Sequence, residues 1–394
     1  MLGMYDVIVV GAGPTGSYAA LRLAQLGYQV IVLEQKEEPG ENICCTGIVS
    51  AECLDTFNLN AAIFREVKSA RFFAPCGQFI RFARENFQAC IIDTASLNRV
   101  LIKRARSYSA DCLFSARVLC VSPETDHISA TADYRGEQRI ITARIVVLAC
   151  GLECQLPEEL GLGRITNFAI GAQAEVNTNI NEVEVYLDQN LFPGFFGWLV
   201  PTSGSSGLAG LITPKSPALY LGNFLHHLQA QGKIDTTEVD RKFGKIPLGT
   251  LPRTYGDQLV VVGDAAGQVK PTTGGGIYLG LLCTDMAVKC LDRAFSMNDF
   301  SPARLSLYDK QWRARLGREL QMGYRVRRFY HKLTNQRIDH LFKVAQGGGI
   351  AELIAEWPGF SFDWHGALVS EVGKHLAIAA ALRPLKGLLK NSNY

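Results

Sequence analysis

The sequence lacks the features of membrane-spanning, repetitive or disordered proteins. No apolar run reaches the length of a membrane span, no segment repeats at a fixed period, and no low-complexity linker is present. The 40 basic and 37 acidic residues nearly balance, and no DNA- or RNA-binding motif accompanies the basic ones. Nucleic acid is therefore not expected as a partner. With 394 residues, 47% of them hydrophobic, the chain is long enough for two or three ordered domains.

The cysteines lack the spacing of a disulfide framework or a metal site. There are 11, an odd number, with no CxxC repeat. No set of four ligands has a spacing known for zinc or iron–sulfur centres, so we predict no metal. The N-terminus enters an apolar strand directly and carries no signal peptide. These observations predict a cytoplasmic protein with reduced thiols.

A dinucleotide-binding loop is the first positive feature. The β-branched run from Tyr5 to Val10 predicts a buried parallel strand, and GAGPTG follows it directly. Such glycines allow a tight turn and close backbone approach to a pyrophosphate, which the N-terminus of the next helix attracts. A second strand ends at an acid that can bind ribose hydroxyls. The predicted nucleotide ligands are Gly11, Gly13, Pro14, Thr15, Gly16 and Glu34.

A second glycine-rich motif, GDAAGQVKPTTGGGI, begins at Gly263 and favours FAD over a nicotinamide cofactor. It follows a predicted buried strand over 259–262, and an acid at this point can bind the ribityl hydroxyls. Glycines at the start of the following helix leave room for a flat ring, and the helix amides can support negative charge on a reduced flavin. The predicted flavin ligands are Gly263, Asp264, Gly274, Gly275, Gly276 and Ile277.

A third buried strand, over 145–149, closes on Cys150 and Gly151, where such folds return beneath the nucleotide. Gly151 is therefore a further predicted cofactor contact. Aromatic hydroxylases usually carry Asp-Gly at this position, so the Cys-Gly pair counts against a hydroxylase.

With these motifs, the chain resembles the geranylgeranyl reductases, flavoenzymes that saturate isoprenoid double bonds. The resemblance covers roughly the first 300 residues and rests on GAGPTG, EEPGENICCTGIVS, PGFFGWLVP and GDAAGQVKPTTGGGI. It implies that Cys45 lies at the active face of the flavin, either as a proton source or as a packing group. The family's Tyr-x-Trp-x-Phe-Pro motif reads Phe-Gly-Trp-Leu-Val-Pro here, without the Tyr hydroxyl. The lipid-cavity residues that the resemblance implies are Phe195, Phe196, Trp198 and Pro201.

The resemblance implies hydride transfer from reduced flavin to an isoprenoid alkene in a dry, apolar pocket. The sequence leaves the electron donor open between NADPH and reduced ferredoxin, because no second GxGxxG marks a nicotinamide domain. Two alternatives share the fold: a flavin monooxygenase or halogenase, and a flavoprotein that passes electrons to a quinone. A halogenase needs a lysine to carry the activated halogen, and Lys270 beside the flavin loop is the sole, awkward candidate.

The expected fold is α/β, a Rossmann-type FAD-binding domain interleaved with a mixed β-sheet substrate domain and followed by a C-terminal helical region. We assign residues 1–64, 93–163 and 251–300 to the FAD-binding domain, 65–92 and 164–250 to the substrate domain, and 301–394 to the helical region. Segment 310–343 carries ten basic and two acidic residues. It is a solvated face, a peripheral contact with anionic lipid, or a docking surface for a diphosphate or an acidic donor such as ferredoxin. The C-terminal tail, residues 366–394, mixes apolar and basic residues and could likewise lie at a membrane surface.

Overall fold

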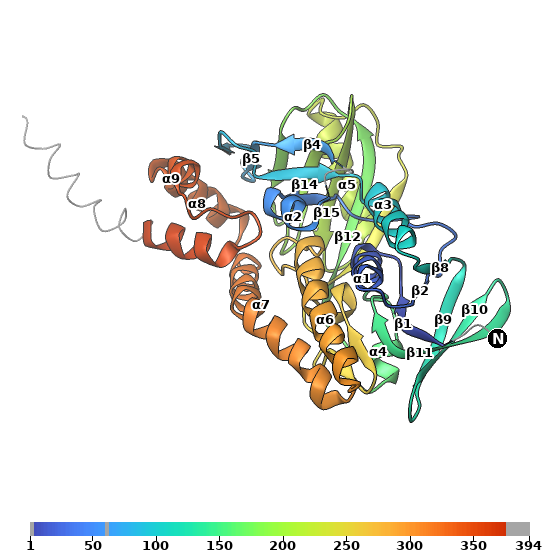
Figure 1. The fold of residues 1–394 in the computed structure, drawn as a ribbon. Helices are drawn as coiled ribbons and strands as arrows, with labels where there is room; N and C mark the ends of the chain where they lie inside the picture. Colours follow the sequence, from blue (N-terminus) through green and yellow to red (C-terminus); the bar gives the residue numbers. More distant parts are fainter. Residues whose placement is uncertain (1–3, 60–62, 376–394) are drawn as a thin grey trace, which may run out of the picture.

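A computed structural model describes residues 4–59 and 63–375, in which a mainly parallel sheet forms the nucleotide half of the molecule (Figure 1). Strand β1 pairs in parallel with β11 on one side and with β2 on the other, as the unbroken apolar runs predict. The order is β17-β18-β11-β1-β2-β8. The bounds are β1 Tyr5–Val10, β2 Val30–Leu33, β8 Asp111–Leu113, β11 Glu137–Leu148, β17 Tyr255–Gly256 and β18 Leu259–Val261.

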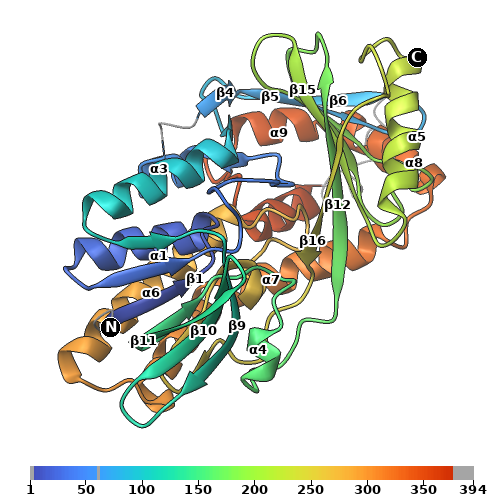
Figure 2. The same cartoon turned by 90° about the vertical axis from the view of Figure 1, so that its right-hand side faces the viewer.

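Helices cover one face of this sheet and a β-meander covers the other (Figure 2). Helix α1 (Pro14–Gln25) packs between α3 (Thr94–Ser107) and α6 (Ile277–Met297). On the opposite face, β9 (Ala116–Pro123) and β10 (Ile128–Tyr134) extend from β11 as antiparallel strands. Alternate residues of β1 enter the two cores, so that Val7 and Val9 face the helices while Ile8 and Val10 face the meander.

A second, seven-stranded sheet has the order β16-β12-β15-β14-β13-β5-β6. All its pairs are antiparallel except β13 with β5. Helix α5 (Pro217–Ala230) packs on β12 and β15. The bounds are β5 Ser69–Phe73, β6 Phe79–Ala83, β12 Phe168–Asn177, β13 Val183–Tyr186, β14 Gly197–Pro201, β15 Ser206–Thr213 and β16 Arg241–Pro247.

A small third sheet and several short helices connect these layers. Strand β7 lies between β3 and β4, antiparallel to both. The bounds are β3 Ile48–Ser50, α2 Ala51–Phe57, β4 Ile63–Val67, β7 Ala89–Ile92 and α4 Leu156–Glu159, with a 3₁₀ turn, η2, at Gly263–Ala266.

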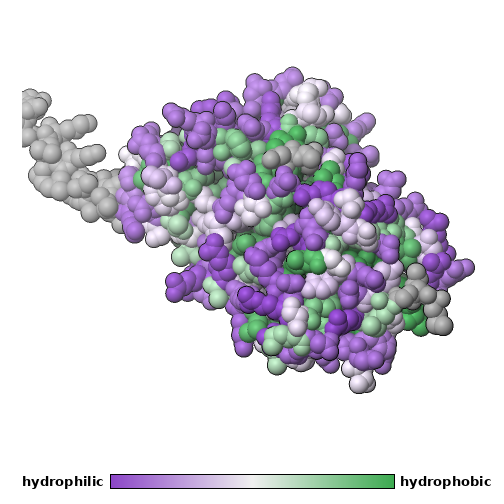
Figure 3. All heavy atoms as spheres, viewed as in Figure 1, coloured by the Kyte–Doolittle hydropathy of each residue, from purple (hydrophilic) through white to green (hydrophobic). Residues whose placement is uncertain are grey.

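The C-terminal helices form a layer beside α6, with α7 (Pro302–Tyr330) as the longest (Figure 1). The buried Tyr308 donates a hydrogen bond to the Val261 carbonyl at 2.9 Å, which ties α7 to the nucleotide sheet. Helices α8 (Asn335–Gly347) and α9 (Ile350–Glu356) follow. No helix within residues 4–59 and 63–375 is both long and apolar enough to cross a membrane. Polar residues cover most of the face shown in Figure 3, with smaller apolar patches between them.

The expected α/β class is confirmed, with its Rossmann-type sheet, mixed second sheet and C-terminal helices. The assignment of residue ranges to three domains stays a proposal. Residues 376–394 of the predicted helical region, which include most of the tail considered as a membrane contact, lie outside the described residues.

Candidate active site

A cavity of about 1120 Å³ is lined by residues from both large sheets. Its wall includes the carboxyl ends of β1 and β2, the edge at which α/β sheets bind ligands. Most of the residues predicted from the sequence meet here. The predicted residues that line the cavity are Gly11, Gly13, Pro14, Thr15, Glu34, Cys45, Gly151, Phe196, Trp198, Asp264, Gly274, Gly275, Gly276 and Ile277.

The glycines of the first loop have different physical roles. Gly11 has φ +100°, and a Cβ there would lie 2.5 Å from the Ala149 carbonyl oxygen. A Cβ on Gly16 would overlap the Gly11 carbonyl oxygen, so Gly16 permits α1 to start against the loop. Gly13 has no heavy atom within 4 Å of its Cβ position and lines the cavity. Gly13 thus leaves open the space that a pyrophosphate would need at the start of α1.

Glu34 is held at the end of β2 by two backbone amides. Its Oε2 accepts from the Ala12 N–H at 2.6 Å, and its Oε1 accepts from the Lys36 N–H at 2.9 Å. The side chain is buried but borders the cavity. The carboxylate therefore has a fixed position, and its contact with a ribose stays a prediction.

A chain of hydrogen bonds stabilises the second glycine-rich loop, which begins at Gly263. Gly263 has φ +70°, and a Cβ there would lie 2.6 Å from Thr15 Oγ1, which brings the two glycine motifs together. The Gly263 N–H donates to Gln268 Oε1 at 2.8 Å, and Gln268 Nε2 donates to the Tyr308 hydroxyl at 2.7 Å. Helix α7 therefore stabilises the turn that carries Asp264.

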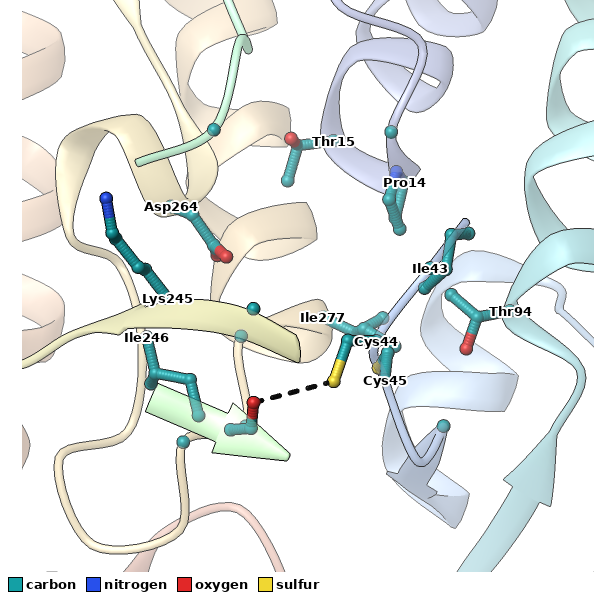
Figure 4. A pocket seen from close by; sticks show the side chains of 18 of the residues that line it. Pro14, Thr15, Ile43, Cys44, Cys45, Thr94, Lys245, Ile246, Asp264 and Ile277 are labelled. Carbon is teal, nitrogen blue, oxygen red and sulfur yellow. Dashed lines mark hydrogen bonds between the residues drawn. The ribbon is translucent and has the colours of Figure 1, made fainter. Parts of the chain in front are cut away.

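The Asp264 side chain points into the cavity, as Figure 4 shows. The residue is exposed to the cavity, and the protein that surrounds the cavity still desolvates its carboxyl group enough to raise its pKa to about 6. A carboxyl held in this way can accept or donate a hydrogen bond near neutral pH. This suits the predicted contact with ribityl hydroxyls.

We expect Asp264→Asn to change the pH dependence of stability in the flavin-free protein. Because the pKa of Asp264 is higher in the folded than in the unfolded state, wild type should lose stability as the pH rises through about 4 to 6. The variant should lack this loss, so its melting temperature should exceed that of wild type above pH 6 and approach it below pH 4. Thermal unfolding across this range measures the difference, with the exposed Asp257→Asn as control. A constant difference at all pH values would contradict the assignment.

Cys44 and Cys45, neighbours in the chain, line the same cavity as Ile277, and Figure 4 shows all three side chains. Burial raises the pKa of the Cys45 thiol, so Cys45 stays protonated at neutral pH. Burial also raises the pKa of Cys44 to about 12, and its sulfur is 3.5 Å from the Lys242 carbonyl and 3.8 Å from that of Gly171. Cys44 thus fastens this loop to the second sheet, whereas Cys45 remains the candidate for the flavin face.

The aromatic segment divides between the cavity and the core. Phe196 and Trp198 line the cavity, with ring centroids 5.8 Å apart. Phe195 and Pro201, expected as lipid contacts, do not line it. Phe195 is buried in a small core cluster against which Phe196 and Trp198 pack, because it belongs to the turn before β14 and does not follow the strand's alternation.

Sequence reasoning missed an apolar wall formed by β4, β5 and β13. Phe72, Val185, Trp198 and Gly210 are register partners in a row across four strands. A Cβ on Gly210 would lie 2.5 Å from the Trp198 ring, so this glycine lets the indole lie across β15. The period-two alternation of the strands is the signal that could have predicted this wall. The residues of the apolar wall are Val67, Ala70, Phe72, Val183, Val185 and Leu187.

Lys270 and two residues from beyond α9, Phe362 and Asp363, also line the cavity. No motif in the sequence relates Asp363 to the flavin loop. Within the part of the chain that the structure describes, no three His, Cys, Asp or Glu side chains are grouped so as to hold a metal ion.

Residues 4–206 match the family of FAD binding domains, and the chain belongs to this family. The loops at Gly11 and Gly263 and the open space above Gly13 suit its cofactor, so the prediction of FAD is confirmed.

Comparison with known proteins shows which flavoproteins the chain is similar to. The chain is 28% identical over 352 residues to a digeranylgeranylglycerophospholipid reductase of Methanocaldococcus jannaschii, covering 86% of this chain and 90% of the relative. The structure is similar to that of a geranylgeranyl bacteriochlorophyll reductase-like protein of Thermoplasma acidophilum. Their TM-score is 0.81 at 22% identity, over 95% of this chain and 100% of the other. The predicted resemblance to geranylgeranyl reductases is confirmed, as is the class of flavin-dependent oxidoreductase.

The fold itself is shared with other chemistries. A flavin-dependent halogenase, CmlS, is similar with a TM-score of 0.68 at 16% identity, covering 99% of this chain and 78% of the halogenase. Function must therefore be argued from the site.

Proposed function

We propose that this protein is an FAD-dependent reductase that saturates carbon–carbon double bonds of an isoprenoid lipid. FAD, when bound and reduced, supplies a hydride. The residues of the two glycine loops would hold the cofactor, and Cys45 would lie at the face that meets the substrate. NADPH or reduced ferredoxin would return the electrons.

The observation that carries this proposal is the continuity of one cavity from the glycine loops to the apolar wall. All six residues of the wall are apolar, and Phe72, Val185 and Trp198 form a continuous row. An unactivated alkene offers no carbonyl to polarise, so its reduction depends on holding the double bond in place and excluding water. Aliphatic and aromatic side chains can do both for a prenyl chain.

The halogenase alternative gains no support from Lys270. Its ammonium is 2.7 Å from Asp363 Oδ1, and both side chains are buried. The amine is held in an ion pair and is not free to accept an activated halogen.

The test is an anaerobic reaction of the full chain with its flavin reduced by dithionite. Geranylgeranyl diphosphate and a digeranylgeranyl glycerophospholipid in detergent micelles are added separately, while flavin absorbance and product mass are recorded. We expect flavin reoxidation with a gain of two hydrogens per saturated bond. A flavin that stays reduced with both lipids until oxygen enters would favour a monooxygenase or halogenase.

A further inference from the structure

Lys270 and Asp363 form an ion pair in the cavity wall that the mechanism above does not use. The Nζ–Oδ1 distance is 2.7 Å, and the residues are 5% and 1% exposed. The ring of Phe362 lies 4.8 Å from the ammonium. Burying two charges is costly, and apolar side chains of similar size often stabilise a fold as well or better. Stability alone therefore gives little reason for an ion pair here.

The ammonium group lies beside the glycines predicted to support the flavin. The Lys270 N–H donates to the Gly275 carbonyl at 3.1 Å, and the Gly274 N–H donates to the Lys270 carbonyl at 2.9 Å. Lys270 Nζ is 3.4 Å from the point where a Gly275 Cβ would lie. These contacts fix the lysine against the start of α6, where both Gly274 and Gly275 line the cavity.

Both members of the pair retain hydrogen-bonding capacity. Asp363 Oδ2 is buried and has no hydrogen-bond partner. An ammonium group has three N–H bonds, and among the described residues Asp363 is the one hydrogen-bond acceptor of Lys270 Nζ. A buried carboxylate oxygen without a protein partner is unusual, and a ligand or an ordered water in the cavity would supply the missing hydrogen bond.

Other proton carriers in the wall are less suited to protonate a substrate. Loss of a proton from Cys45 would leave a buried thiolate, and the same burial raises the pKa of this thiol, whereas loss of a proton from Lys270 leaves a neutral amine. The Tyr278 hydroxyl donates to Glu52 at 2.5 Å, and burial and this carboxylate together raise its pKa. Asp264 is predicted to bind the ribityl chain. Lys245 also lines this end of the cavity, but its side chain is exposed and pairs with Glu153 at 3.1 Å. Lys270 is the buried lysine of the two.

Resting on the proposed function, we propose that Lys270 delivers the proton that completes reduction of the alkene, and that Asp363 is its positioning residue. One alkene carbon receives the hydride that reduced FAD supplies. The π electron pair forms the bond from the other carbon to a proton of Lys270, and the broken N–H bond leaves its electrons on Nζ. The neutral amine, still beside the Asp363 carboxylate, then regains a proton from water. The alkene gains two electrons and two hydrogens, and the flavin is left oxidised.

A purely structural role for the pair makes a different prediction. His365 also holds the segment around Asp363 in place. Its ring Nδ1 is 2.8 Å from Thr272 Oγ1, and its backbone N–H donates to Glu319 Oε1 at 2.5 Å. Glu319 further accepts from the Gly366 N–H at 3.0 Å. Glu319→Ala thus loosens the same segment and leaves Lys270 in place. It is the matched control.

The experiment compares wild type, Lys270→Met, Lys270→Arg, Asp363→Asn and Glu319→Ala as full chains loaded with FAD. Each is reduced anaerobically and mixed with whichever lipid reoxidises wild type, in H₂O and in D₂O. We expect reoxidation to slow about 100-fold or more in both Lys270 variants, the range for loss of a general acid. Arginine keeps the charge and the pair but does not release its proton at this pH, so Lys270→Arg tests the idea even if the methionine variant folds poorly. Asp363→Asn should show an intermediate loss and an altered pH profile, and Glu319→Ala should stay within about threefold of wild type.

A measurement without substrate checks the position of the charge. We expect Lys270→Met to lower the midpoint potential of the bound flavin and Glu319→Ala to leave it unchanged. Tenfold weaker relative binding of reduced flavin corresponds to about 30 mV for a two-electron couple. The proposal is overturned if Lys270→Arg keeps the wild-type rate and solvent isotope effect, or if Glu319→Ala slows reoxidation as much as the Lys270 variants do. If wild type reacts with no isoprenoid lipid, the proposed function fails, and this inference fails with it.

Discussion

Replacing Gly16 with alanine is expected to destabilise the nucleotide half and abolish retention of FAD. The new Cβ would overlap the Gly11 carbonyl oxygen, which is backbone and cannot rotate away. Helix α1 would have to shift from β1, although its residues Ala19, Ala20 and Leu23 are buried against the core. Overpacking of this kind costs about 1–3 kcal/mol, and more where backbone must move. Thermal unfolding of the flavin-free protein and the flavin-to-protein ratio after purification measure the two effects.

Gly13→Ala separates stability from cofactor binding in the same loop. No heavy atom lies within 4 Å of the new Cβ, so the flavin-free protein should melt close to wild type. The methyl group would nevertheless stand in the space left for the pyrophosphate, and the affinity for FAD should fall. Equal loss of stability in both variants would show that the loop does not have the described geometry.

The second large effect is expected from filling the cavity at the apolar wall with Ala70→Phe. Ala70 lies on β5 opposite Val183 and is a small residue in a wall of larger ones. A phenyl ring at this position would occupy space proposed for the prenyl chain. We expect anaerobic reoxidation by the lipid to slow about 100-fold, because a displaced substrate loses the alignment on which such reactions depend.

Three controls make the Ala70 result specific. FAD content and reoxidation by oxygen should be unchanged, since the glycine loops are not altered. Ala70→Val adds less volume and should give a smaller loss. If Ala70→Phe reacts with the lipid as fast as wild type, the prenyl chain does not lie against this wall.

The nucleotide half could be predicted from the sequence because its signals are local. The apolar run from Tyr5 to Val10 is β1 to the residue. Glycine motifs are equally local, since a turn with positive φ at Gly11 or Gly263 depends on neighbouring residues. Much of the candidate cofactor site was predicted for this reason.

The rest of the site depends on contacts that no local pattern encodes. Asp363 meets Lys270 across 93 residues, and a single acid in a helical region gives no sign of such a partner. Phe195 and Phe196 are chemically alike, yet one enters the core and the other the cavity, because the turn before β14 sets their directions. Period-two alternation can mark an apolar face of β13, but which face meets the cavity depends on the pairing of β13 with β5.

The wall of the cavity joins Val10, near one end of the described chain, to Phe362 and Asp363, near the other. During synthesis, a ribosome would release the first glycine loop long before the residues that complete the enclosure. Domains generally fold as units while the chain emerges, N-terminal parts first. Here the nucleotide sheet is incomplete until β11 and β18 have been synthesised. The pocket lacks one side until residue 363 has left the exit tunnel. The flavin can therefore meet its complete pocket only after the chain has been synthesised beyond residue 363.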